Sequence, residues 1–233
     1  MNRNYSKLDG FLKNIKNEPW PNEWPDEAFR LIKTNATKTQ LRLLSGLIGN
    51  NASETEMHNF LLTNQVLFSF ALYSFRTGHH GIWVYSKQVI KPKIEGVSKG
   101  IIPDFIVGGK NSDGFQWWII ELKGVNDNIF TLDSNNELYF SSTVNKGLCQ
   151  LLEYINSCSE IQGHLRDIFK LKDFREPNGL LIVGKESELE NDERRQKLKG
   201  AWNRLNTTKL EIRTYDWLLR NFTENAKAFH LPD

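Results

Sequence analysis

Two apolar segments separated by a glycine-rich stretch most strongly constrain the fold of this chain. Residues 101–107 and 115–123 are almost continuously apolar, and the stretch between them, 108–114, combines three glycines with Asn, Ser and Asp. Short apolar runs bounded by turn residues are typical of buried strands, and two such strands joined by a short loop form an antiparallel hairpin. The sequence therefore predicts a core hairpin with its turn at 108–114.

The periodicity on either side of this hairpin predicts the other elements of an α/β fold. Before it we expect helices at 26–33 and 38–49, a helix from the capping box Ser53-x-x-Glu56 to about residue 68, and a strand at 82–90. After it we expect a loop, a long helix, a buried strand, a charged helix, a short strand and a last helix, at about 124–141, 143–171, 179–183, 190–206, 210–213 and 216–222. This order indicates a mixed sheet, in which a meander comes first and later strands are added by crossovers.

Domain organisation follows from the same pass along the chain. Residues 1–50 contain a turn-rich, proline-containing segment and short helices, which predicts a short helical N-terminal preface. Residues 51–233 contain the remaining elements and are predicted to form the main domain.

Composition excludes several classes of protein. Hydrophobic residues make up 39% of the 233 residues, which is enough to bury a core and excludes a largely disordered chain. Lys and Arg total 30 against 28 Asp and Glu, so nucleic-acid binding would need a local basic patch. The chain begins without the apolar core of a signal peptide and has no run long enough to cross a bilayer, so we expect a cytoplasmic protein without a membrane partner.

The two cysteines are not expected to form a disulfide. Cys149 and Cys158 are nine positions apart in a predicted helix, which separates them by roughly 13 Å. We interpret both as buried, small apolar residues, because no histidine is placed to activate either thiol.

Three charged residues lie at corresponding ends of the two hairpin strands. Glu121 and Lys123 are two positions apart, so both side chains point to one side of a strand. Asp104 precedes Glu121 by 17 positions, and the turn can bring the two carboxylates together. Mg²⁺ is commonly bound by one or two carboxylates, lowers the pKa of bound water and neutralises phosphate charge. The pattern points to phosphodiester hydrolysis, although the salt-bridged face of an exposed hairpin has the same spacing.

Ile102-Pro103-Asp104-Phe105 and Ile120-Glu121-Leu122-Lys123 resemble the signature of the PD-(D/E)xK nuclease superfamily. More narrowly, the chain resembles the nuclease domain of the Shedu antiphage defence family over about 50–225. The likeness extends to segments outside the two strands: Ser53-Glu54, Gln150 with Tyr154, and Thr214-Tyr215-Asp216. It implies a restriction-endonuclease-like core, in which a helix, a three-stranded meander, a helix and a strand are followed by an extra helix, strand and helix.

The resemblance also implies roles for individual residues. Asp104 and Glu121 would be ligands of Mg²⁺, or of Mn²⁺, with the Leu122 carbonyl as a third ligand. Lys123 would position the attacking water or stabilise charge. Glu54 would be an outer-shell metal ligand, unless it serves only the helix dipole and the capping box.

The helix after the hairpin would add further site residues. Gln150 lies one turn before Tyr154, so both can face the carboxylates, although a solvated position is the alternative for Gln150. Lys146 lies one turn earlier still and could contact phosphate. Residues 185–200 form a run of mixed charge, in which Arg194 and Arg195 are candidate contacts of the nucleic-acid backbone.

Other residues have weaker functional interpretations. His79 and His80 could bind a metal, but adjacent histidines between glycines are more often exposed turn residues. Trp20 and Trp24, in the proline-rich turn, are candidates for an oligomer or partner contact.

The expected function is that of a metal-dependent DNA endonuclease, which nicks or cuts DNA in bacterial antiphage defence. Its expected partners are double-stranded DNA, further copies of the chain in a homo-oligomer, and a phage-derived trigger. Two alternatives remain open at this point. One is a non-catalytic module of nuclease fold that binds DNA ends or a protein partner, and the other is a nuclease that acts on RNA.

Overall fold

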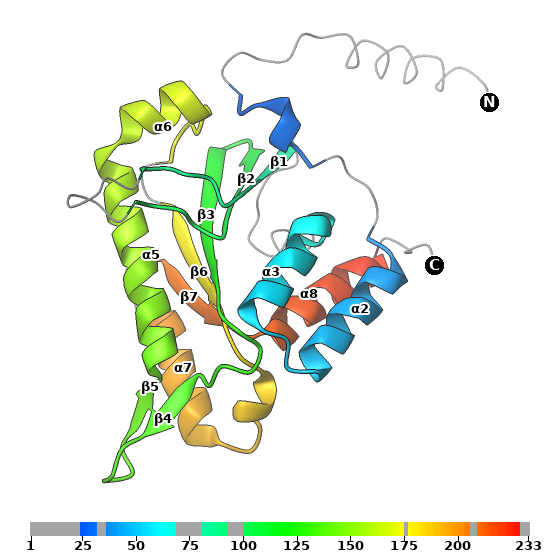
Figure 1. Cartoon of the computed structure of the whole chain (residues 1–233), viewed down its shortest axis with the longest axis vertical. Coiled ribbons are helices and arrows are strands. Elements are labelled where there is room, and N and C mark those ends of the chain that lie inside the picture. The colour runs from blue at the N-terminus through cyan, green and yellow to red at the C-terminus, as the bar shows by residue number, and fades with distance from the viewer. Residues whose placement is uncertain are drawn as a thin grey trace.

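A mixed five-stranded β-sheet forms the centre of the protein, and helices cover both of its faces (Figure 1). The strand order is β1-β2-β3-β6-β7. β1, β2 and β3 form an antiparallel meander, whereas β6 and β7 run parallel to β3. The strands span Gly81–Ser86 (β1), Phe105–Asn111 (β2), Gly114–Leu122 (β3), Asn178–Ile182 (β6) and Leu210–Arg213 (β7). The predicted α/β class, with a meander followed by crossover strands, is confirmed.

The computed structural model describes residues 24–31, 36–68, 81–92, 100–174, 177–205 and 209–228, with side chains described to residue 224. No helix within these ranges is long and apolar enough to span a membrane.

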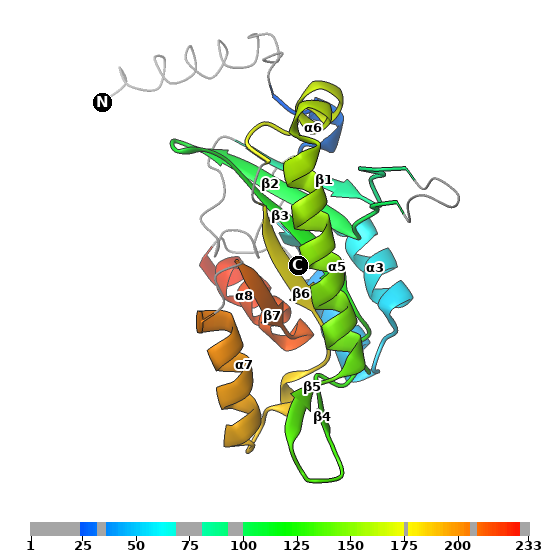
Figure 2. The same ribbon diagram turned by 90° about the vertical axis from the view of Figure 1, so that its left-hand side faces the viewer.

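Each face of the sheet has its own apolar core. In β3, Trp118 and Ile120 point to one face, and Trp117 and Ile119 point to the other, because successive side chains of a strand alternate. Helices α2, α3 and α8 cover the first face, and α5, α6 and α7 cover the second (Figures 1 and 2). These helices span Lys38–Gly49 (α2), Glu54–Thr63 (α3), Ser142–Glu160 (α5), Gln162–Phe169 (α6), Glu193–Leu205 (α7) and Tyr215–Ala228 (α8).

The starts of α2 and α3 agree with those predicted from the sequence. α2 has the predicted bounds, and α3 begins directly after Ser53. The Ser53 hydroxyl accepts a hydrogen bond from the Glu56 backbone N–H at 3.3 Å, and the Ser53 N–H donates to Glu56 Oε2 at 2.8 Å. α3 ends at Thr63, before the expected end near residue 68. At the observed end, the Asn64 side chain donates a hydrogen bond to the Phe60 carbonyl.

The predicted hairpin is confirmed, but its turn is shorter than the expected 108–114, because β2 continues to Asn111 and the turn is confined to residues 112 and 113. Gly108 lies opposite Trp117 in the β2–β3 register. A Cβ atom at Gly108 would lie 2.1 Å from the Trp117 ring. The glycine is therefore needed for the close approach of an indole to the strand backbone.

Replacing Gly108 by alanine is expected to destabilise the protein by about 2–4 kcal/mol, because the buried Trp117 ring must move. Gly46→Ala is the matched control, since Gly46 lies exposed within α2 with no atom within 4 Å of an added Cβ. That control should stabilise the protein by up to about 1 kcal/mol. Urea unfolding of both variants measures the difference, and equal midpoints would contradict this packing.

Other predicted elements differ in their extent. The single helix expected at 143–171 is divided at Ile161 into α5 and α6, where the Gln162 side chain donates to the Cys158 and Phe174 carbonyls. The helix expected at 26–33 is only a 3-10 turn, Glu27–Phe29 (η1). After it, Arg30 pairs with Trp83, so this segment extends the sheet at β1.

The ranges expected as loop or strand near the site also change. The strand predicted from residue 101 begins at Phe105, and Ile101 forms only an isolated bridge with Lys91. In place of the loop at 124–141 there is a two-stranded hairpin, β4 (Phe130–Leu132) and β5 (Leu138–Phe140). The Glu188 carboxylate, in the 3-10 turn Glu186–Glu188 (η2), holds this hairpin by accepting two backbone N–H groups.

The proposed preface boundary at residue 50 stays a prediction. Residues 1–23 lie outside the described ranges, whereas α2 packs with α3 and α8 in one apolar core through Leu44 and Ile48.

Candidate active site

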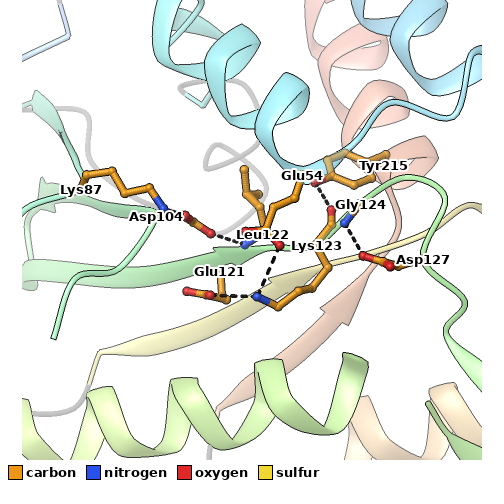
Figure 3. A network of polar contacts seen from close by, with 9 residues as sticks. All are labelled: Glu54, Lys87, Asp104, Glu121, Leu122, Lys123, Gly124, Asp127 and Tyr215. Carbon is orange, nitrogen blue, oxygen red and sulfur yellow. Dashed lines mark hydrogen bonds and ion pairs between the residues drawn. The ribbon is translucent and has the colours of Figure 1, made fainter. Parts of the chain in front are cut away.

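Two buried carboxylates converge where β2 begins and β3 ends (Figure 3). Asp104 directly precedes β2, and Glu121 is the penultimate residue of β3. Because Phe105 pairs with Ile120, the next position of the register places Asp104 opposite Glu121. Asp104 is 2% exposed and Glu121 is 5% exposed. The structure thus brings together the two carboxylates that the hairpin pattern predicts to be neighbours, and it buries them.

Asp104 is held by groups on both neighbouring strands. Its Oδ2 atom accepts a hydrogen bond from the Leu122 backbone N–H at 2.7 Å, and its Oδ1 atom forms an ion pair with Lys87 Nζ. The Lys87 backbone N–H also donates to the Asp104 carbonyl. Lys87 follows β1 with a φ of 48°, and sequence reasoning missed it because no local pattern links it to Asp104.

Lys123 connects Glu121 to the first turn of α3. Its Nζ atom lies 3.0 Å from Glu121 Oε1 and 3.6 Å from Glu54 Oε2. Of the two glutamates in the first turn of α3, Glu56 makes the capping contacts with Ser53. Glu54 contacts Lys123 of the site. The second oxygen of Glu121, Oε2, is buried without a hydrogen-bond partner among the described residues. One acceptor in the site therefore remains available to a ligand.

The electrostatics of the site are dominated by burial. Burial, and then the neighbouring Asp104 charge, raise the pKa of Glu121 to about 7, although Lys123 opposes this shift. Burial lowers the pKa of Lys123, but the Glu121 and Glu54 carboxylates outweigh it, so this pKa lies above its ordinary value. The lysine thus stays charged, while one proton or one cation would relieve the crowded carboxylates.

α5 brings a phenol and an amide to the same site. Tyr154 is buried, and burial together with the Glu121 and Asp104 charges raises its pKa to about 12. A hydrogen bond from the Gln150 side chain partly opposes that shift. Lys146, one turn earlier, is exposed. Tyr154 therefore lies within electrostatic reach of both carboxylates, with Gln150 beside it.

A family model described as Shedu protein SduA, C-terminal, matches residues 51–219. This range includes every residue of the carboxylate site described above, and it covers more than two thirds of the chain. The chain belongs to the Shedu family. No curated protein matches its sequence. Membership of the Shedu family suggests a role in antiphage defence.

A buried tyrosine supports the backbone at the edge of the Shedu site. The Tyr215 hydroxyl donates to the Lys123 carbonyl at 2.6 Å, and the ring is fully buried. Asp127 Oδ2 accepts the Gly124 N–H at 2.6 Å (Figure 3). The Val125 N–H donates to the Ala52 carbonyl. The Thr-Tyr-Asp segment thus has a structural task, which is to position the chain directly after Lys123.

Two buried carboxylates, Asp104 and Glu121, form the centre of the Shedu site. Among the residues that the structure describes, no group of three or more His, Cys, Asp and Glu side chains could hold a metal ion. Among the described residues, Glu54 contacts Lys123 and forms no hydrogen bond or ion pair with Asp104 or Glu121. Its role as an outer-shell ligand, like that of the Leu122 carbonyl, stays a prediction.

The two predicted arginine contacts lie away from the carboxylates. Arg194 donates to the Asn136 carbonyl and pairs with Glu137 in the β4–β5 turn. Arg195 pairs with Glu188 and Asp192. Both arginines therefore tie α7 to neighbouring segments, and their contact with nucleic acid stays a prediction.

The structure also places further histidine, tryptophan and cysteine residues. His58 stacks on Phe105 and lies 3.3 Å from Ser86 Oγ, which makes it a neighbour of the site. Trp24 packs edge-on against Trp83 of β1. Both cysteines are free, and Cys158 is buried as expected, whereas the expected burial of Cys149 is wrong because its side chain is exposed. Trp20, His79 and His80 lie outside the described residues.

Proposed function

We propose that this Shedu family member is a metal-dependent DNA endonuclease that hydrolyses phosphodiester bonds in antiphage defence. The observation that carries the proposal is that Asp104 and Glu121 are buried together beside Lys123, while Glu121 Oε2 has no hydrogen-bond partner among the described residues. A structural ion pair would not need a second buried carboxylate whose pKa is raised to about 7. Family membership adds independent support for a defence role.

The donor set fits Mg²⁺ or Mn²⁺. Asp104 and Glu121 would hold the cation, since magnesium sites often use one or two carboxylates and leave the remaining positions to water and phosphate. Glu121 Oε2 is free to coordinate, whereas the Lys87 ammonium would have to leave Asp104 Oδ1. When bound, the cation would lower the pKa of a water molecule and offset phosphate charge.

The side chains of this chain have separate tasks in such a reaction. Hydrolysis forms a bond from a water oxygen to phosphorus and breaks the bond to one sugar oxygen. Lys123, held at 3.0 Å from Glu121, would donate hydrogen bonds to the water or to a phosphate oxygen. Lys87, once released from Asp104, would offer a second ammonium to the phosphate. Tyr154 and Gln150 would line the α5 side of the site.

The fold and partners belong to the same proposal. The order α3, β1-β2-β3, α5, β6 supports the restriction-endonuclease-like core that the family resemblance implies. Double-stranded DNA is the proposed substrate, and a homo-oligomer would place two sites on the two strands of a duplex. A phage-derived trigger would switch on an enzyme that is otherwise restrained.

Supercoiled plasmid provides the test, in Mg²⁺, Mn²⁺ or EDTA. The wild-type protein should nick or linearise the plasmid only with a metal, and Lys123→Met should lower the rate by at least about 100-fold. Lys197→Met is the matched control, because Lys197 is an exposed lysine of α7 paired with Glu193. Its rate should equal that of the wild type.

The other outcomes of this experiment are also decisive. Equal cleavage in EDTA would contradict the metal requirement, and full activity of Lys123→Met would remove Lys123 from the site. If the wild type binds plasmid in every condition without cutting it, the non-catalytic binding module becomes the better description. The same assay with an RNA substrate tests the remaining alternative, a nuclease that acts on RNA.

A further inference from the structure

A pocket of about 390 Å³ lies between α7 and the end of β7, and it shares no residue with the carboxylate site. One face of α7 forms its wall, because Gln196, Lys199, Gly200, Asn203 and Arg204 recur at helical spacing. Its lining residues are Leu189, Gln196, Lys199, Gly200, Asn203, Arg204 and Arg213. The volume is in the range of small-ligand sites.

The lining of this α7–β7 pocket carries three positive charges and no carboxylate. Arg213 pairs with Glu211 at 2.7 Å and lies over the Trp217 ring. Lys199 and Arg204 form no ion pair in the part of the chain that the structure describes, although Glu186 and Glu211 act on Lys199 from a distance. Burial and then Arg213 lower the pKa of Lys199 to about 8. Positive charge is therefore in excess here.

Local contacts fix the wall of the pocket that carries these charges. The Asn203 side chain accepts the Ile212 N–H at 3.0 Å and donates to the Ile212 carbonyl at 3.1 Å, so α7 is fastened to the backbone of β7. A Cβ at Gly200 would lie 2.8 Å from Arg204 Nη1, which shows that the guanidinium lies against the helix. Gln196 donates to the Leu189 carbonyl. The pocket is therefore formed before any ligand arrives.

We propose that the α7–β7 pocket binds a phosphoryl group, carried by a free nucleotide or by the backbone of a nucleic acid. Guanidinium groups present paired donors that match phosphate oxygens, and an ammonium adds a point charge. Leu189 supplies an apolar wall beside the charges. This site is independent of the carboxylates, so it can be tested whether or not the protein cleaves DNA.

The first test uses inorganic phosphate and adenosine monophosphate, titrated calorimetrically into the full chain in EDTA at constant ionic strength. Lys199→Met should weaken binding of these probes by tenfold or more, and Arg204→Gln should act in the same direction. Lys197→Met is the control, because it removes an exposed lysine from the same helix, 73% exposed and paired with Glu193. It should bind as the wild type does.

A 20-base-pair duplex, followed by fluorescence anisotropy in EDTA, identifies the source of the phosphate. If the variants lose affinity for the duplex but the small probes never bind, the pocket holds a backbone phosphate. If they lose affinity for the small probes alone, it holds a free nucleotide or phosphate. Wild-type affinity of Lys199→Met and Arg204→Gln for all three probes would overturn the proposal, as would absence of binding by the wild type.

Discussion

Replacing Glu121 by glutamine is expected to abolish metal-dependent cleavage, with a fall in rate of at least about 100-fold. The substitution keeps the size of the side chain and one acceptor oxygen, but it removes the charge from the only site oxygen that is buried without a partner among the described residues. It also removes the acceptor charge that holds Lys123 at 3.0 Å. Single-turnover plasmid cleavage in Mg²⁺ measures the effect.

Glu190→Gln is the matched control for this experiment, because Glu190 is an exposed glutamate that follows η2 outside the carboxylate site. It should cleave at the wild-type rate. A Glu121→Gln protein that retains more than a tenth of the wild-type rate would show that Glu121 is not a ligand or a charged participant. The endonuclease proposal would then need another carboxylate.

The same substitution is expected to stabilise the metal-free protein at alkaline pH. The pKa of Glu121 is about 7 in the folded protein against 4.5 for an unperturbed glutamate. Deprotonation above pH 7 therefore costs the folded state on the order of 3 kcal/mol, from about 1.4 kcal/mol per pH unit between these values. Glutamine carries no charge to desolvate or to repel Asp104, so the variant escapes this cost.

The direction with pH follows from proton binding. Below pH 4.5 the glutamate is protonated in both states, and wild type and variant should differ little. Between pH 4.5 and about 7 the unfolded chain loses the proton while the folded protein keeps it, so wild-type stability falls as the pH rises. The advantage of Glu121→Gln should thus grow through this window and stay constant above it.

Urea unfolding in EDTA at pH 4.5 and pH 8 measures this difference in the free energy of unfolding. Glu190→Gln should show no pH-dependent difference from the wild type, since its carboxylate is exposed. If Glu121→Gln is less stable than the wild type at pH 8, the Glu121–Lys123 ion pair outweighs the cost of burial. Glu121 and Lys123 would then form a stabilising ion pair, and the raised pKa of Glu121 would no longer support a functional site.

The hairpin and its charged residues were predictable because they depend on local rules. Strand alternation places Glu121 and Lys123 on one side, and an antiparallel register can bring Asp104 opposite Glu121. The capping box at Ser53 identified the start of α3 for the same reason, since its contacts span three residues. The family resemblance, confirmed by the match over residues 51–219, supplied the functional interpretation.

Other features escaped local rules because distant residues decide them. Gly108 lies in a stretch with the composition of a turn, yet it is part of β2. The Trp117 ring of the next strand leaves no space for a Cβ atom at this position. The helix pattern at 143–171 is continuous in sequence, but Gln162 divides it by bonding to Phe174. In both cases a contact with another segment of the chain outweighs the local preference.

By itself, the amino-acid sequence determined the α/β class, the meander, and the pairing of Asp104 with Glu121. These follow from hydrophobic periodicity and from the two-residue repeat of a strand, which act over a few residues. Only the tertiary structure decided that Lys87 reaches Asp104, that Tyr215 holds the Lys123 carbonyl, and that α7 and β7 enclose a basic pocket. Such contacts join residues far apart in the chain, so their geometry exists only once the layers have packed against the sheet.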